Sequence, residues 1–187
     1  MSLPEKDERF TYLDYLTWED DERWELIDGR PYNMTPAPGF RHQQVVGNLY
    51  LILRHALQGK RCTVGIAPTD VVLSDYDVVQ PDIFVICDEK KITDDIIRGA
   101  PDLVIEVASP ATARKDRLEK KRLYEAARVR EYILLDPVAH FAERFLLESD
   151  GRYGRGEVFG PQHVLVLQSL DAVELPLWEV FETPPAD

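Results

Sequence analysis

The clearest helical pattern in the chain lies between Phe40 and Gly59. Apolar residues recur there every three or four positions, which is the spacing of one face of an α-helix. They are Val45, Leu49, Ile52, Leu53, Ala56 and Leu57. Gly59 is a typical residue to end such a helix. A shorter helix is predicted over the segment TYLDYL, because Thr11 can cap it and Asp14 follows three residues later.

Short apolar and β-branched runs, each bounded by Pro, Asp or Gly, predict strands. These runs are CTVGIA, DVVLS, DIFVI, DLVIEVA and EYILLD. Asp-Gly pairs at 28–29 and 150–151 lie between β-prone segments and indicate two hairpins. A helix over about residues 112–128 would complete a strand–helix–strand crossover at 102–136. The tail runs VLVL and LPLWEVF are predicted to form edge strands or a covering layer.

The order of these elements predicts the α/β (α+β) fold class, with a mixed central sheet flanked by helices and with peripheral β-hairpins. The chain has 187 residues, of which 44% are hydrophobic and 30% charged, as in ordinary globular domains. We therefore expect one domain over 1–187, with its core at about 11–137 and with peripheral strands and a tail over 138–187.

Two features bear on the compartment. The N-terminal segment MSLPEKDERFTYLDYL lacks the apolar stretch of a signal peptide, and no apolar run approaches the roughly 18 residues that span a membrane. Cys62 and Cys87 each lie in an apolar, strand-like run without a metal-ligand residue nearby. We interpret both as buried, reduced thiols. The prediction is a cytoplasmic protein without a membrane partner.

The formal net charge of −12 counts against simple electrostatic binding of nucleic acid. It does not exclude a nuclease, because carboxylates that hold a cation can meet a phosphate through that cation. Basic residues also concentrate in one stretch, since eight Lys and Arg accompany three acids between positions 114 and 130. Arg117, Lys121 and Arg122 are expected on an exposed face, which is either simply solvated or in contact with phosphates.

Two acidic residues belong to the predicted strands, Asp82 at the start of DIFVI and Glu106 inside DLVIEVA. A carboxylate in a buried strand is costly unless it is paired or bound to a cation. Two acids on neighbouring strands supply the oxygen ligands that hard divalent cations prefer. We expect both carboxylates on one face of the sheet, near enough to share a cation. Ion pairs with arginine are the alternative.

The predicted helix after Glu106 carries charges on its core-facing side. At about 100° per residue, one stripe holds Asp116, Lys120, Leu123 and Ala127. Asp116 and Lys120 would then point inward, where Asp116 could hold the ammonium in place. An exposed Asp–Lys pair on a rotated helix is the alternative, and Leu118 outside the stripe favours it.

At this point the sequence resembles a known family. The run PDLVIEVASPATARKDRLEKKRLYEAARVREYILLDP resembles the core of bacterial putative restriction endonucleases of the PD-(D/E)xK nuclease superfamily. Matching pieces upstream are WELIDGRPYNMTPAP, Arg41-His42 at the start of a helix, PTDVVL and VVQPDIFVI. The resemblance covers about residues 11–137. It implies a restriction-endonuclease-like fold, whose four-stranded mixed core sheet is flanked by helices.

The resemblance also implies roles for individual residues. The Asp of the superfamily motif falls on Asp82 and its (D/E)xK acid falls on Glu106, but the motif lysine is replaced by Ala108. A family lysine on the following helix falls on Lys120. Glu25 falls on a family acid, either a further metal ligand or a residue beside one. Two more residues match family positions without a known role, and we expect them beside the metal ligands or the substrate; they are His42 and Asp116.

The implied function is endonucleolytic hydrolysis of phosphodiester bonds in nucleic acid, with DNA favoured. Asp82, Glu106 and the backbone carbonyl of Val107 would hold Mg²⁺, or Mn²⁺ in its place, and Lys120 would assist water attack. A homodimer is suggested only by analogy with nucleases that cut two strands.

Two alternatives from other classes stay open. One is an inactive nuclease fold that binds nucleic acid or another partner, which Ala108 and the acidity favour. The other is a scaffold protein whose acids pair with arginine. The sequence has no Gly-rich phosphate loop, GxSxG motif or Cys–His pair, which argues against nucleotide-dependent enzymes and nucleophilic-residue hydrolases.

Overall fold

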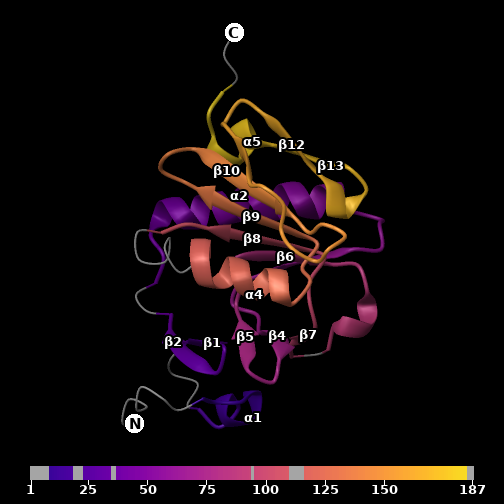
Figure 1. The fold of residues 1–187 in the computed structure, drawn as a ribbon. Coiled ribbons are helices and arrows are strands. Elements are labelled where there is room, and N and C mark those ends of the chain that lie inside the picture. Colours follow the sequence, from indigo (N-terminus) through magenta and orange to yellow (C-terminus); the bar gives the residue numbers. More distant parts are fainter. Residues whose placement is uncertain (1–8, 19–22, 35–36, 94, 110–115, 185–187) are drawn as a thin grey trace.

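A computed structural model describes residues 9–18, 23–34, 37–93, 95–109 and 116–184, with only the backbone described at 116 and 117. Figure 1 shows one sheet in the upper part of the molecule and a second sheet below it, near the N-terminal helix. The upper sheet lies between α2 (Phe40–Ala56) and α4 (Lys121–Ala126). This mixed arrangement of sheets and helices confirms the predicted fold class.

The upper sheet has six strands in the order β11-β10-β9-β8-β6-β3. Their bounds are β11 Glu157–Phe159, β10 Phe141–Leu146, β9 Glu131–Asp136, β8 Leu103–Val107, β6 Ile83–Ile86 and β3 Thr63–Ile66. Among the described strands of this sheet, β8 and β9 are the pair that runs in parallel, and the chain between them contains α4, so the predicted crossover is confirmed. Every residue of β8 and all but the last of β9 are buried, as the continuous apolar runs of these strands indicate.

The second sheet has five strands in the order β2-β1-β5-β4-β7. Their bounds are β2 Arg30–Asn33, β1 Trp24–Ile27, β5 Asp77–Val79, β4 Val71–Ser74 and β7 Ile97–Arg98. The hairpin predicted across Asp28-Gly29 is confirmed, and both turn residues have positive φ, 51° and 72°, as a type I′ turn requires. The second predicted hairpin pairs β10 with β11, but its connection is longer than the Asp-Gly turn alone.

The predicted helices at 11–16 and 40–59 are confirmed. The first is α1 (Tyr12–Tyr15), which has the expected capping box of Thr11 and Asp14. Helix α2 buries an apolar stripe against one face of the six-stranded sheet. The tail forms β12 (Val164–Leu167), β13 (Val173–Pro176) and α5 (Leu177–Phe181), which pack into the same core cluster. Two 3₁₀ turns complete the fold, η1 (Glu89–Lys91) and η3 (Gln168–Leu170).

The helix expected at 112–128 differs from the prediction. It contains one turn of π-helix, η2 (Asp116–Lys120), followed by α4; the expected N-terminal turn lies outside the described residues. A π-turn holds more residues than an α-turn, so the 100° spacing fails over this stretch. Lys120 nevertheless points inward and is 3% exposed, whereas Leu118 is 49% exposed. Such π-turns are frequent at functional sites because they redirect single side chains.

The prediction of two reduced thiols is wrong, because Cys62 and Cys87 form a disulfide. Strands β3 and β6 are antiparallel, and their last pair toward this end is Thr63 with Ile86. The two cysteines form the next pair outward, so the register of the sheet brings them together. The sequence around each cysteine does not indicate this pairing of β3 with β6. Within the described part of the chain, none of the helices combines the length and apolar character needed to cross a membrane.

Candidate active site

A buried lysine links the two sheets. Lys120, at the end of η2, has its Nζ atom 2.8 Å from Oε1 of Glu25 and 2.8 Å from Oε1 of Glu106. Glu25 comes from β1 in the five-stranded sheet and Glu106 from β8 in the six-stranded sheet. All three side chains are almost fully inaccessible to solvent. Charges buried to this extent require partners of opposite sign, which each of these groups has.

Glu106 is also fixed by a tyrosine to which the sequence pattern assigned no function. Tyr124 of α4 is fully buried, and its hydroxyl donates a 2.6 Å hydrogen bond to the same Oε1 atom of Glu106. Burial, followed by the nearby carboxylates of Glu106 and Glu25, raises the pKa of Tyr124 well above its ordinary value. The hydroxyl therefore keeps its proton and remains a donor. In the sequence, the signal available for Tyr124 was its position one helical turn after Lys120, which places both side chains on the same side of the helix.

Glu25 is held in place from its own sheet. The backbone N–H of Gln80, the residue after β5, donates a 3.0 Å hydrogen bond to Oε1 of Glu25. Strand β5 is paired with β1, so the position of this donor depends on sheet pairing rather than on sequence proximity. Glu25, which the family resemblance marked as an acid of interest, thus belongs to the same cluster as Glu106 and Lys120.

Asp82 precedes β6 and lies beside the end of β8. Its Oδ2 atom accepts a 2.9 Å hydrogen bond from the backbone N–H of Val107 and lies 3.1 Å from Nε2 of His42. The register of β6 and β8 pairs Ile83 with Ile105, so one step outward sets Asp82 against position 106. The structure therefore brings the two predicted acids to adjacent strand ends.

His42 projects from the first turn of α2 and is buried. One ring nitrogen contacts Asp82, and the other, Nδ1, has no hydrogen-bond partner among the described residues. The predicted place of His42, beside a candidate metal ligand, agrees with this contact. The side chain of Asp116, which was expected to hold Lys120, lies outside the described residues. Among the described residues, Glu25 and Glu106 contact the ammonium group of Lys120.

The oxygen donors at this site suit a small, hard cation. Carboxylates of Asp82 and Glu106 on adjacent strand ends are the ligand type that Mg²⁺ prefers, and Mg²⁺ usually takes only one or two protein carboxylates and retains several waters. Among the described residues, no three His, Cys, Asp or Glu side chains converge as a metal cluster. The placing of an ion between Asp82 and Glu106 stays a prediction.

The strand position that carries lysine in the superfamily motif is Ala108, which is small and partly buried. The ammonium group at Glu106 comes instead from Lys120, fourteen residues further along the chain. The ammonium group therefore reaches the Glu106 carboxylate from the helical segment η2 rather than from strand β8. The inward-facing Lys120 predicted from periodicity is therefore confirmed as a neighbour of Glu106.

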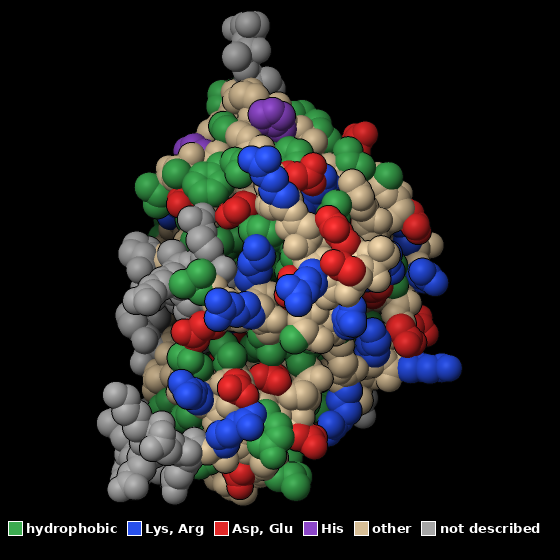
Figure 2. All heavy atoms as spheres, in the orientation of Figure 1, with side chains coloured by type: hydrophobic (Ala, Val, Ile, Leu, Met, Phe, Trp, Pro, Cys, Tyr) green, Lys and Arg blue, Asp and Glu red, His purple; other side chains and the backbone are tan. Residues whose placement is uncertain are grey.

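The predicted exposed basic face is only partly correct. Arg122 is exposed, but Lys121 is partly buried with its Nζ atom 3.8 Å from the centre of the Phe145 ring. This cation–π contact explains why Lys121 does not point into solvent. The side chain of Arg117 lies outside the described residues. Figure 2 shows Lys and Arg side chains spread over this face of the molecule, with Asp and Glu between them.

The comparisons with known proteins agree with this architecture. An uncharacterized protein of Synechocystis sp. is 28% identical over 143 residues, covering 74% of each chain. The crystal structure of a putative nuclease belonging to DUF820 from Anabaena variabilis superposes with a TM-score of 0.76 over 93% of this chain and 98% of that one, at 18% identity. At this identity the likeness shows a common fold. Residues 12–177 match the family model described as putative restriction endonuclease, and this chain therefore belongs to that family.

Proposed function

We propose that the protein is a metal-dependent endonuclease that hydrolyses phosphodiester bonds of nucleic acid, with DNA favoured over RNA. The observation that carries this proposal is the buried Lys120, 2.8 Å from both Glu25 and Glu106. Asp82 adjoins this cluster through its hydrogen bond from Val107. The cation of Lys120 and the carboxylates of Glu25 and Glu106 are costly to bury at the junction of two sheets, and a catalytic role accounts for keeping them.

The residues divide the work as follows. Asp82, Glu106 and the backbone carbonyl of Val107 would hold Mg²⁺, or Mn²⁺, which supplies a water of lowered pKa and neutralises phosphate charge. Lys120 stabilises the charge that develops on the phosphate during attack. His42 orients Asp82, and Tyr124 together with Lys120 fixes the rotamer of Glu106.

The test replaces Asp82, whose side chain is 18% exposed and so less costly to alter than its buried neighbours. We expect Asp82→Asn to lower cleavage of plasmid and oligonucleotide DNA by about a hundredfold in Mg²⁺ or Mn²⁺, with the fold intact by circular dichroism. Arg54→Ala is the control, because Arg54 is exposed on α2 and has no proposed contact with the substrate. Equal cleavage by the parent and Asp82→Asn would contradict the proposal.

A second candidate is a nuclease fold that binds nucleic acid without cutting it. Ala108 in place of the motif lysine favours it, as does the ion pairing of Lys120 with two acids. Absence of cleavage in every metal, together with retained oligonucleotide binding, would select this function. Reversal of the charge at Arg122 should then weaken that binding and flatten its salt dependence.

The compartment and the assembly belong to this proposal as well. We expect the reaction in the cytoplasm, although the Cys62–Cys87 disulfide counts against a compartment that keeps thiols reduced. A homodimer would suit cleavage of both strands of a duplex. Sedimentation with and without oligonucleotide, and thiol titration of protein taken directly from cells, test these two expectations.

A further inference from the structure

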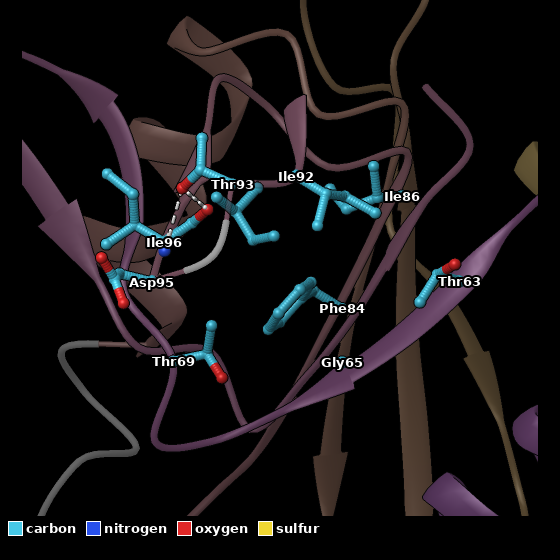
Figure 3. Close-up of a pocket in the computed structure, with 10 residues that line it drawn as sticks. Thr63, Gly65, Thr69, Phe84, Ile86, Ile92, Thr93, Asp95 and Ile96 are labelled. Carbon is cyan, nitrogen blue, oxygen red and sulfur yellow. Dashed lines mark hydrogen bonds between the residues drawn. The ribbon is translucent and has the colours of Figure 1, made fainter. Parts of the chain in front are cut away.

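A cavity of about 280 Å³ opens beside the edge strand β3. Figure 3 shows its side chains around an open space, with the ring of Phe84 beside strand residue Gly65. Phe84 and Gly65 are directly opposite each other in the β3–β6 ladder. A Cβ atom at Gly65 would lie 2.1 Å from the Phe84 ring. The missing side chain at Gly65 thus lets the aromatic ring lie flat over β3 and form part of the cavity wall.

The cavity is close to the candidate active site. Asp82 directly precedes β6, and Phe84 follows Asp82 by two residues, a separation of roughly 6–7 Å at about 3.3 Å per extended residue. Phe84 also belongs to the same apolar cluster as Tyr124, which contacts Glu106. Successive phosphates of one DNA strand are roughly 3.4 Å apart along the helix axis. The cavity therefore lies within about two nucleotides of a phosphate bound at Asp82.

The walls combine apolar and polar groups. Besides Phe84, the apolar lining consists of Ile86, Ile92, Ile96 and Ile97. Asp95 contributes a carboxylate, which only accepts hydrogen bonds when ionised. The hydroxyl groups of Thr69 and Thr93 donate to the carbonyls of Ile66 and Ile96. The Thr93 oxygen also accepts a 3.1 Å hydrogen bond from the backbone N–H of Ile96, so one of its two lone pairs is already used. The lining therefore combines aliphatic side chains with the acceptor oxygens of Asp95 and Thr69, and Phe84, which is 3% exposed, forms part of the wall rather than an open stacking face.

We propose that this cavity receives one nucleobase of the substrate strand near the scissile phosphate, and that it selects bases with an exocyclic amino group. This inference rests on the proposed function. The aliphatic walls suit the apolar faces of a flat base that is unstacked or single-stranded. The Asp95 carboxylate repels the phosphate backbone but accepts from the exocyclic amino group of cytosine, adenine or guanine, which thymine lacks.

The first experiment needs no cleavage. Cytidine and thymidine 5′-monophosphates are titrated at millimolar concentration while the backbone amide resonances of Gly65 and Phe84 are followed by NMR. We expect cytidine monophosphate to shift both resonances and to bind about tenfold more tightly than thymidine monophosphate. Asp95→Asn should remove this preference, and Ile92→Trp, at a rim position that is 38% exposed, should block binding. Glu89→Gln removes an exposed charge outside the lining and is the matched control.

The second experiment measures cleavage of oligonucleotides that differ at one position near the cut. We expect faster cleavage with cytosine or adenine than with thymine at one such position in the parent and in Glu89→Gln, and no difference in Asp95→Asn. Unshifted Gly65 and Phe84 resonances, or a base preference that survives Asp95→Asn, would overturn the cavity assignment while leaving the nuclease proposal intact. Base-dependent shifts in a protein that cuts nothing would support the cavity and reject the nuclease.

Discussion

Replacing Lys120 by methionine tests the candidate site most directly, because the structure predicts effects on both stability and activity. A lysine on a solvated helix face could be replaced with little loss of stability. Lys120 is instead 3% exposed and lies 2.8 Å from both Glu25 and Glu106. Methionine fills a similar volume but removes the charge, so it leaves two buried carboxylates near each other without the cation between them.

The expected cost follows from this burial. Removing one partner of a buried ion pair costs about 3–5 kcal/mol, since the remaining charge is left in a poorly solvated place. For a domain of this length, each kcal/mol lowers the melting temperature by about 2–4 °C. Lys120→Met should therefore melt roughly 6–20 °C below the parent. If the variant is folded at the assay temperature, we also expect about a hundredfold loss in cleavage rate, or roughly 3 kcal/mol of transition-state stabilisation.

The assay is thermal unfolding followed by circular dichroism, at increasing Mg²⁺ concentration, for Lys120→Met, the parent and the exposed control Arg122→Ala. Because a divalent cation compensates carboxylate charge, Mg²⁺ should raise the melting temperature of Lys120→Met more than that of the parent. Adding Glu25→Gln to Lys120→Met removes one of the two negative charges and should restore part of the stability.

Two results would refute this reasoning. Melting of Lys120→Met within about 2 °C of the parent would mean that the ion pairs with Glu25 and Glu106 contribute nothing to stability. Equal Mg²⁺ responses in variant and parent would mean that removing the lysine does not strengthen binding of the ion by these carboxylates. Cleavage at the parental rate by a folded Lys120→Met would separately exclude a catalytic role for the lysine.

Three further predictions concern other buried groups. Tyr124→Phe removes the hydroxyl that donates to Glu106. We expect the free energy of unfolding in urea to fall by about 1.5–3 kcal/mol and Mg²⁺ to bind more weakly in calorimetry. Unchanged values of both would mean that the hydroxyl does not position Glu106. Replacing both Cys62 and Cys87 by serine removes the cross-link between residues 25 positions apart and should lower the free energy of unfolding by about 2–4 kcal/mol. Reduction of the parent should cause the same loss. Free thiols in the untreated protein would contradict the disulfide. Burial raises the pKa of Glu131 above its ordinary value despite hydrogen bonds from Ser169. The folded state then holds this proton more tightly than the unfolded state, so this group lowers stability as pH rises from the unfolded pKa through the folded one. The free energy of unfolding of Glu131→Gln, relative to that of the parent, should therefore increase from pH 4 to pH 7. A difference that decreases with rising pH would contradict a raised pKa of Glu131.

Much of the secondary structure followed from the sequence because its causes are local. The 3.6-residue period of α2 and the Asp-Gly turn between β1 and β2 lie within a few residues of one another. The same is true of the capping box formed by Thr11 and Asp14. Glu106, a single charged residue inside an apolar run, could likewise be singled out, because burying a charge is costly wherever the fold places it. Lys120 could be singled out by its place on the core-facing stripe of the following helix.

The tertiary structure decided which of these groups meet. Glu25 and Lys120 are 95 positions apart and become neighbours only because one sheet packs against the helix that follows β8 in the other. The pairing of Cys62 with Cys87 depends on the register of β3 and β6, which local sequence does not encode. The hydrogen bond from Tyr124 to Glu106 likewise depends on where the helix places Tyr124. The π-turn that precedes Tyr124 changes this placement relative to a regular α-helix. Periodicity specifies the face on which a residue lies, and only packing between elements determines what that face contacts.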